Sequence, residues 1–153
     1  YDAFAIFAPN VNAYRRFLPN QFVPVNNTWG QNNRSVALRI PTGDPLNTRI
    51  EHRMSGAEAN SYLVLASILS GIHYGIANKL LPDKPRTDNA CENPDENMPK
   101  NINQALKLLE NSKILEEYFT KEYIELYVDL KRKEFNAFND EISDVEYKWY
   151  LNL

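Results

Sequence analysis

A long uncharged segment constrains the fold of this chain more than any other feature. Residues 59–77 contain no Asp, Glu, Lys or Arg, and their apolar pattern predicts a helix over 59–81 that a proline-rich turn at 82–85 ends. A membrane span is the alternative. The polar residues within the segment favour a helix buried in a large core, with His73 packed or hydrogen-bonded there rather than bound to a metal. These polar residues are Asn60, Ser61, Ser67, Ser70, His73 and two glycines.

A short charged run precedes this segment at residues 48–54 (TRIEHRM). If the run forms a strand, its side chains alternate between two faces, so that Arg49, Glu51 and Arg53 share one of them. Such a face suits a site in which guanidinium groups bind carboxylate or phosphate and the carboxylate holds a metal ion. It equally suits a solvated strand surface whose charges pair with one another. The residues of this run alone leave both interpretations open.

Two further strands are expected over 22–29 and 35–40, separated by a polar turn at 30–33. In the second of them Arg39 projects to the opposite side from Leu38 and Ile40. A loop at 41–45 then leads to the charged strand. We therefore predict a small antiparallel sheet that brings Arg39 to the same surface as the charged run.

Helices are expected on both sides of this sheet in the sequence. Short helices over 2–8 and 12–17 end before Pro9 and Pro19. Amphipathic helices follow near the C-terminus, over 102–109, 112–119 and 121–138, and Ser143 with Glu146 forms a capping box for a last one. The fold class is thus α+β, with a small antiparallel sheet packed by a long buried helix and several C-terminal helices.

Residues 83–100 are rich in Asp, Glu, Asn and Pro, and they predict a long exposed loop. The acidic residues Glu92, Asp95 and Glu96 could bind a cation. Their spacing is not that of a calcium loop, so a solvated loop is favoured.

Composition narrows the class of protein. A chain of 153 residues is long enough for one domain with a real core, and its net charge of −3 gives no reason to expect a nucleic-acid partner. The single Cys91 cannot form an internal disulfide, and no basic-then-apolar leader begins the chain, so we expect a cytoplasmic protein. Tyr1 opens an apolar helical stretch without a capping residue before it. This start predicts a fragment of a longer protein, with a processed chain as the alternative.

Four segments together resemble the C-terminal part of the glutamine synthetase catalytic domain. They are residues 12–19 (NAYRRFLP), 33–41 (NRSVALRIP), 49–53 (RIEHR) and 59–63 (ANSYL), in the family's order and at nearly its spacing. The resemblance is strong over 4–80 and fainter over the C-terminal helices. It implies that the sheet is part of the family's catalytic barrel and that the chain is one C-terminal fragment. Its parts would be 1–58 with the site, the buried helix 59–81, the acidic loop 83–100 and the helical end 101–153.

The resemblance implies an ATP-dependent ligase. Members of the family use ATP to activate the side-chain carboxylate of L-glutamate as γ-glutamyl phosphate, which an amine then attacks. Such a transfer needs positioned and permanent positive charge, which arginine supplies, and a carboxylate oxygen suits Mg²⁺ or Mn²⁺. The implied roles are glutamate binding by Arg16 and Arg53, ATP binding by Arg34, Arg39 and Arg49, a catalytic contribution by Arg34, and metal binding by Glu51.

One position departs from the ammonia-using glutamine synthetases. Those enzymes carry a glutamate in a Gly-Tyr-Glu-Ala-Pro run that helps to deprotonate ammonium, whereas residues 20–24 of this chain read NQFVP and place Phe22 there. A phenyl ring cannot accept a proton, but it can line a channel for an alkyl amine. His52 and the pair Trp29-Gly30 also look more like the γ-glutamylpolyamine (glutamate–putrescine) ligases. We therefore favour an organic amine or polyamine over ammonia; in the alternative, Phe22 only packs.

The family's other metal-binding residues and its small N-terminal domain lie upstream of the resembling segment. Because Mg²⁺ prefers several oxygen ligands, Glu51 alone cannot build its site. We therefore expect the isolated chain to be inactive and to need the remainder of its catalytic domain and neighbouring subunits. A non-catalytic, structural member of the superfamily is the alternative of a different class. Five arginines and one carboxylate on a single surface count against that alternative.

Overall fold

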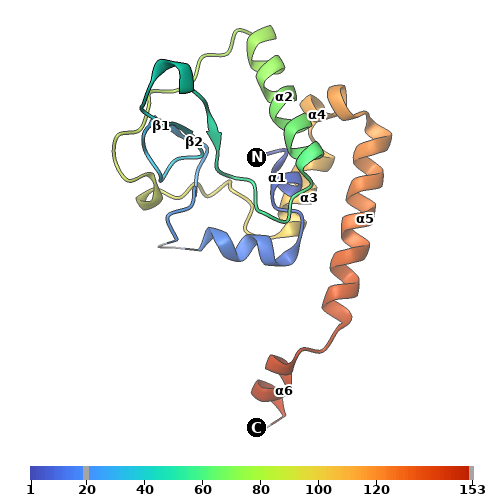
Figure 1. Ribbon diagram of the computed structural model, residues 1–153. Helices are drawn as coiled ribbons and strands as arrows, with labels where there is room; N and C mark the ends of the chain where they lie inside the picture. The colour runs from blue at the N-terminus through green and yellow to red at the C-terminus, as the bar shows by residue number, and fades with distance from the viewer. Residues whose placement is uncertain (19–20, 152–153) are drawn as a thin grey trace.

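The computed structural model describes residues 1–18 and 21–151, with a small sheet on one side and helices on the other (Figure 1). The strands are β1 (Trp29–Gln31), β2 (Leu38–Ile40) and β3 (Glu51–His52). The α-helices are α1 (Phe4–Phe7), α2 (Ser61–Ala77), α3 (Ile102–Glu110), α4 (Lys113–Phe119), α5 (Lys121–Asp140) and α6 (Asp144–Tyr150). Short 3-10 helices are η1 (Val11–Phe17), η2 (Pro45–Asn47) and η3 (Ala90–Glu92). The predicted α+β class is confirmed.

The sheet is mixed rather than antiparallel. Strand β2 pairs with β3 antiparallel, as predicted, but β1 and β2 run parallel, with Trp29 opposite Leu38. The predicted strand over 22–29 is wrong, because Trp29 alone belongs to a strand. Residues 32–37 carry the chain back to the beginning of β1, where the N–H groups of Ala37 and Leu38 both donate to the carbonyl of Thr28, at 3.0 and 3.1 Å. This return replaces the expected hairpin.

The hydrophobic core lies between α1, α3, α4 and α5. Helix α3 buries Ile102, Ala105, Leu106 and Leu109, which share one face at helical spacing. Phe4 of α1 and Val128 of α5 are almost fully buried against this face. The C-terminal helices predicted from the sequence are therefore confirmed, with ends that differ by one or two residues.

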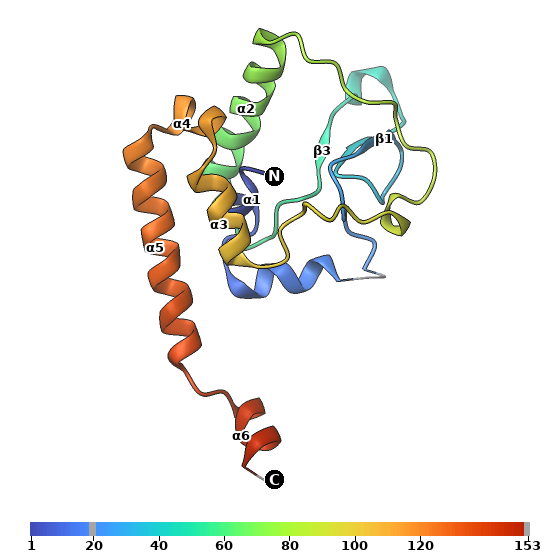
Figure 2. The same cartoon turned by 180° about the vertical axis from the view of Figure 1, so that it is seen from behind.

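Helix α2 confirms the predicted helix but not its predicted burial. One side of α2 contacts α1 and α4, and Figure 2 shows it at the edge of the helical layer. A stripe of large apolar side chains is instead 51–83% exposed; it consists of Tyr62, Leu65, Leu69, Ile72 and Ile76. His73 is hydrogen-bonded as expected: its Nδ1 lies 2.7 Å from the hydroxyl oxygen of Tyr118. In the described part of the chain no helix combines the length and apolarity that crossing a membrane requires.

The segment after α2 is only partly the exposed loop that was predicted. It runs along the free edge of β1, where the N–H of Arg86 donates to the carbonyl of Trp29 at 2.8 Å. A side chain at Gly30 would meet the Arg86 carbonyl at 2.5 Å, so only glycine permits this close approach. Further along, Ala90 is fully buried and its N–H donates to Oγ of Ser35. These contacts fasten the segment to the sheet that carries the charged residues.

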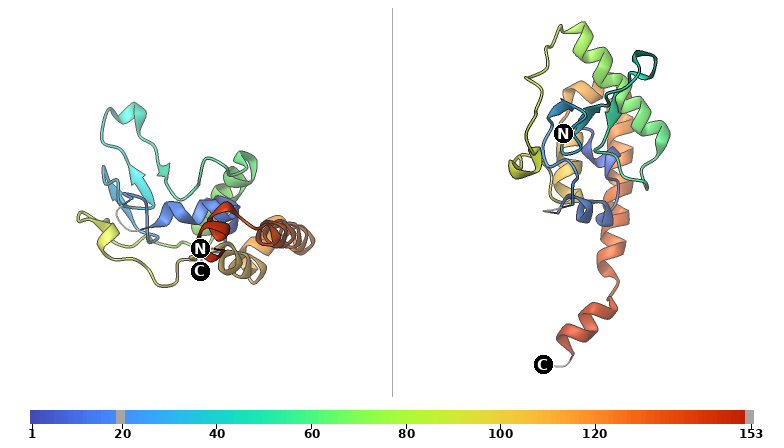
Figure 3. Two further views of the ribbon diagram at one scale, coloured as in Figure 1. Left: turned by 90° about the horizontal axis from the view of Figure 1, so that it is seen from below. Right: turned by 60° about the vertical axis from the view of Figure 1, so that its left-hand side comes forward.

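Helix α6 projects away from the rest of the molecule beyond α5 (Figure 3). The predicted capping box is confirmed: the N–H of Ser143 donates to the carboxylate of Glu146, and the N–H of Glu146 donates to Oγ of Ser143. Trp149 and Tyr150 are exposed on this helix.

Candidate functional site

Glu51 lies at the centre of an ion network on one face of the sheet. The β2–β3 register places Arg39 directly opposite Glu51, and residues paired in this way project to the same side. Nη1 of Arg39 lies 2.9 Å from Oε2 of Glu51, and Nη2 of Arg49 lies 3.1 Å from Oε1. Nη2 of Arg39 also donates to the side-chain carbonyl of Asn32 at 2.6 Å. The structure thus brings together three of the residues that the strand pattern placed on one surface.

The two arginines hold Glu51 in its charged form. The hydrogen bond from Arg39 is the largest cause that lowers the pKa of the Glu51 carboxyl, and the charges of Arg39 and Arg49 act in the same direction. The Arg39 side chain is only 14% exposed, whereas that of Arg49 is 59% exposed. Arg49 is therefore the member of the network that can turn most easily toward an incoming anion.

Arg16 lies close to the end of β3 and contacts the backbone of the residues that follow this strand. Nη1 donates to the carbonyls of Met54 and Ser55, both at 3.1 Å, and Nη2 donates to the carbonyl of Arg53 at 2.7 Å. Burial is the main cause that lowers the pKa of the Arg16 guanidinium, and the neighbouring charge of Arg53 adds to it. The guanidinium also lies 5.4 Å from the centre of the Phe17 ring, within the range of a cation–π contact.

Arg53 points toward the segment that contains Phe22. Its Nη2 donates to the carbonyl of Phe22 at 3.1 Å, while its buried Nε has no acceptor among the described residues. Phe22 has a φ of 49°, in the left-handed region that a non-glycine residue rarely adopts, and its ring is 72% exposed. This carbonyl contact was not foreseen from the sequence, since 31 residues separate the two partners.

Arg34 stands apart from these contacts. It lies in the turn between β1 and β2 and is exposed, and among the ion pairs of residues 1–18 and 21–151 none involves it. Its neighbour Asn33 fixes the turn, because the amide of Asn33 donates to the carbonyls of Arg86 and Asp88. The catalytic and ATP-binding roles expected of Arg34 thus concern a side chain that has no partner within the described structure.

His52 lies on the other face of β3 and packs into the core side of the sheet. Its ring packs against that of Phe7 in a tilted arrangement, with the ring centres 4.4 Å apart. Burial is the main cause that lowers the pKa of His52, and the charge of Arg16 contributes. The ring is therefore neutral at pH 7, and it supports the strand from behind while Glu51 faces the opposite side.

The described residues do not complete a divalent cation site. No group of three or more His, Cys, Asp or Glu side chains comes together within them. Both oxygens of Glu51 accept from guanidinium groups, and a cation there would face the positive charges of Arg39 and Arg49. Since Mg²⁺ needs several oxygens, further ligands from outside this segment would be required for Glu51 to hold it.

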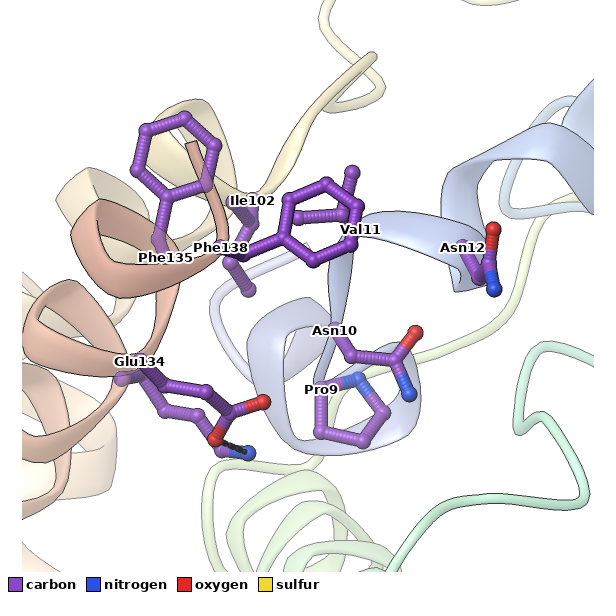
Figure 4. A pocket seen from close by; sticks show the side chains of 9 residues that line it. Pro9, Asn10, Val11, Asn12, Ile102, Glu134, Phe135 and Phe138 are labelled. Carbon is purple, nitrogen blue, oxygen red and sulfur yellow. Dashed lines mark hydrogen bonds and ion pairs between the residues drawn. The ribbon is translucent and has the colours of Figure 1, made fainter. Parts of the chain in front are cut away.

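Two apolar hollows are present that the residues of the ion network do not line. One, of about 200 Å³, is bounded by η1, α3 and α5, with the rings of Phe135 and Phe138 on one side and Val11 and Ile102 near them (Figure 4). The other, of about 500 Å³, adjoins Trp29, Leu38, Ile40, Ile50 and Leu81. None of the six residues with an implied role lines either hollow. The candidate site is therefore the charged surface around Glu51 and the neighbouring pair Arg16 and Arg53.

Comparison with known proteins gives a consistent result. The family model described as glutamine synthetase, catalytic domain, matches residues 1–150. Gamma-glutamylputrescine synthetase PuuA of Escherichia coli (strain K12) is 41% identical over 98% of this chain and 32% of its own length. Type-1 glutamine synthetase 2 of Dictyostelium discoideum is 35% identical over 96% of this chain and 29% of its own length. A solved structure titled apo GmaS without ligand superposes with a TM-score of 0.82, at 26% identity, over 99% of this chain and 35% of that one. The chain spans about a third of the length of these curated relatives.

Proposed function

The chain belongs to the glutamine synthetase family, and from this premise we propose that it is the C-terminal part of an ATP-dependent glutamate–amine ligase. The observation that carries the proposal is the arrangement of the charged residues. Arg39, Arg49 and Glu51 form one network, and Arg16 and Arg53 lie just beyond the end of the same strand. Adjacent cationic centres suit a reaction that joins an anionic amino acid to an anionic nucleotide.

In the proposed reaction ATP phosphorylates the side-chain carboxylate of L-glutamate, and an amine displaces the phosphate to form an amide. Arg34, Arg39 and Arg49 serve the phosphate groups of ATP, because permanently charged guanidinium forks bind phosphate oxygens in pairs. Arg34, exposed and without a partner in the described structure, also stabilises the transferring phosphoryl group.

The glutamate end of the proposed site lies at Arg53 and Arg16. Arg53 donates one hydrogen bond, from Nη2 to the carbonyl of Phe22, and a guanidinium carries five N–H donors, so others can serve a substrate carboxylate. Glu51 would contribute one ligand to Mg²⁺ or Mn²⁺ only together with residues outside this chain, which is why we expect the isolated chain to be inactive.

We further propose that the nucleophile is an alkyl amine or polyamine. Phe22 presents an exposed ring beside Arg53, through its carbonyl contact with that residue. An apolar surface there favours the methylene groups of an alkyl amine or polyamine and offers no group to deprotonate ammonium. The relatives include both an enzyme named for putrescine and one named as a glutamine synthetase, so ammonia is the second candidate nucleophile.

The test is a substrate comparison on the full-length protein that contains this chain. We expect glutamate-dependent ADP release with putrescine to exceed that with ammonia, measured as kcat/KM for each amine. A Phe22→Glu variant should shift the ratio toward ammonia by about tenfold or more, because it restores a proton acceptor. Phe22→Leu is the matched control, and it should keep the preference. A wild-type enzyme that uses ammonia better than any organic amine would refute the organic amine.

A non-catalytic structural role remains the alternative of a different class. It predicts no ADP release with any amine, so that the ion network around Glu51 would serve only the stability of the fold. The free thiol of Cys91 fits the proposed cytoplasmic setting, where disulfides are rare. The proposed partners are L-glutamate, ATP, an amine and the remainder of the catalytic domain with its neighbouring subunits.

A further inference from the structure

Asn32 directly follows β1 and begins the turn that leads to β2. Its backbone φ is 49°, in the left-handed region that glycine and asparagine adopt more readily than other residues. The N–H of Asn32 donates to the carbonyl of Ile40 at 2.8 Å, which fixes the residue to the end of β2. The backbone of Asn32 is thus held in the conformation that places its side chain within hydrogen-bond distance of Arg39.

Arg39 is held by two acceptors of different charge. Its Nη1 donates to Oε2 of Glu51 at 2.9 Å, and its Nη2 donates to the side-chain carbonyl oxygen of Asn32 at 2.6 Å. Because the two bonds use different nitrogens of one planar group, together they fix the direction of the guanidinium. Arg49 is held less tightly, with contacts of 3.1 Å to Glu51 and 3.4 Å to the carbonyl of Asn47. Arg39 is therefore the oriented arginine of the network, and Asn32 supplies its shorter bond.

The charge balance of the network gives a neutral acceptor a specific value. Arg39 and Arg49 share the single carboxylate of Glu51, so these three side chains keep one net positive charge. Asn32 holds Arg39 without cancelling that charge, whereas a second carboxylate would cancel it. Positive charge attracts phosphate oxygens, and an oriented guanidinium binds them in pairs. Asn32 thus fixes Arg39 and leaves its charge for an anion.

We propose that Asn32 is a positioning residue that acts through Arg39: its side-chain carbonyl orients the guanidinium toward the phosphate groups of ATP without neutralising its charge. This inference rests on the proposed ligase function and concerns a residue outside the six with an implied role. Two substitutions separate orientation from charge. Asn32→Gly keeps the left-handed backbone and removes the acceptor, whereas Asn32→Asp keeps both and adds a negative charge.

The kinetic test uses the full-length protein with ATP as the varied substrate and with L-glutamate and putrescine at saturation. Asn32→Gly should raise the KM for ATP by about tenfold, because the guanidinium is no longer oriented, and should leave the KM for glutamate within about twofold. Asn32→Asp should raise the KM for ATP at least as much, because it cancels the net charge. A purely structural Asn32 predicts a wild-type KM for ATP in Asn32→Asp. That result, or an unchanged KM in Asn32→Gly, would overturn the proposal.

A double-variant cycle tests whether the effect passes through Arg39. The combined variant Asn32→Gly, Arg39→Gln should have a KM for ATP within about twofold of Arg39→Gln alone, because Asn32 then has no guanidinium to orient. Losses that multiply would show that Asn32 acts independently of Arg39 and would contradict the proposal. Lys79 is the matched control for a new glycine, because it is exposed and also left-handed, with a φ of 53°. Lys79→Gly should leave the KM for ATP unchanged.

An NMR measurement on the 153-residue chain needs neither nucleotide nor turnover. Two hydrogen bonds should slow rotation of the Arg39 guanidinium, so that its Nη hydrogens give separate signals in the wild type and in Asn32→Asp. In Asn32→Gly one of these bonds is lost, and the signals should merge. Signals that stay separate in Asn32→Gly, or that are already averaged in the wild type, would overturn the orienting role. A full-length protein that fails to ligate glutamate would instead refute the proposed function, so the two failures are distinguishable.

Discussion

Strand β3 and helix α2 follow one another in the chain, yet their side chains differ in whether they find partners within it. Around β3 the charges meet partners within the chain: Glu51 binds two arginines, and Arg16 binds the backbone. On α2 the apolar stripe of Tyr62, Leu65, Leu69, Ile72 and Ile76 stays exposed. The comparison shows that contacts within the described residues assemble the charged surface, whereas covering the helix requires surfaces that these residues do not supply.

The largest effect expected from disturbing the charged surface around β3 is a loss of activity. In the full-length protein, Glu51→Gln should lower the kcat of the proposed ligase reaction by about 100-fold to 1000-fold, because it removes the negative charge that organises Arg39 and Arg49. The measurement is glutamate- and amine-dependent ADP release at saturating substrates.

The matched control for this change is the pair of Glu110 and Arg132, in which both carboxylate oxygens likewise accept from guanidinium nitrogens, at 2.6 and 3.0 Å, but which lies between α3 and α5. Glu110→Gln should leave kcat unchanged. Equal losses in the two variants would mean that the network around Glu51 serves the fold and not the reaction.

The next prediction compares the stability lost when an apolar side chain is removed from the core and from the exposed stripe of α2. Leu106 is fully buried in α3, so Leu106→Ala should lower the free energy of unfolding by about 3 kcal/mol through lost contacts and a cavity. Leu69 on α2 is 55% exposed, so Leu69→Ala should cost less than about 1 kcal/mol. Urea denaturation of the 153-residue chain measures both. Similar losses at the two positions would show that the α2 stripe is covered in solution.

A smaller effect concerns the accessibility of the stripe itself. Leu69→Lys should reduce binding of a hydrophobic dye such as ANS by about half, with little change in the urea midpoint, because a charge interrupts an apolar surface that water already reaches. The control for adding a charge elsewhere is Leu126→Lys, because Leu126 is an exposed residue of α5. A large loss of stability in Leu69→Lys alone would place this residue in a buried interface.

The sequence predicted what depends on neighbouring residues. Strand alternation placed Arg39, Arg49 and Glu51 on one surface, and the Ser143–Glu146 capping box is present. Contacts between distant residues were not predictable: Arg16 meets carbonyls 37 to 39 residues away, and no pattern signals a left-handed Phe22.

The parallel pairing of β1 and β2 escaped prediction for a similar reason. A polar turn between two apolar runs indicates a hairpin, and only the return of the chain to Thr28 reverses that pairing. The burial of α2 was predicted wrongly because an apolar sequence shows that a helix needs cover and not which surface provides it.

The smallest expected effect is a pH dependence of the stability that Glu51 confers. Its carboxyl pKa is lowered in the folded chain, chiefly by the hydrogen bond from Arg39. The folded state therefore gains stability above the ordinary glutamate pKa of about 4.3, and that gain disappears as the pH falls through the lower, folded value. Wild type should be more stable than Glu51→Gln at pH 7, and the difference in urea midpoint should shrink steadily from pH 5 downward, over about two pH units. Glu110→Gln should behave in the same direction, because Arg132 lowers the pKa of Glu110. A difference for Glu51 that grows in acid would require a raised pKa, and the ion network would then not be the state that the folded chain adopts in solution.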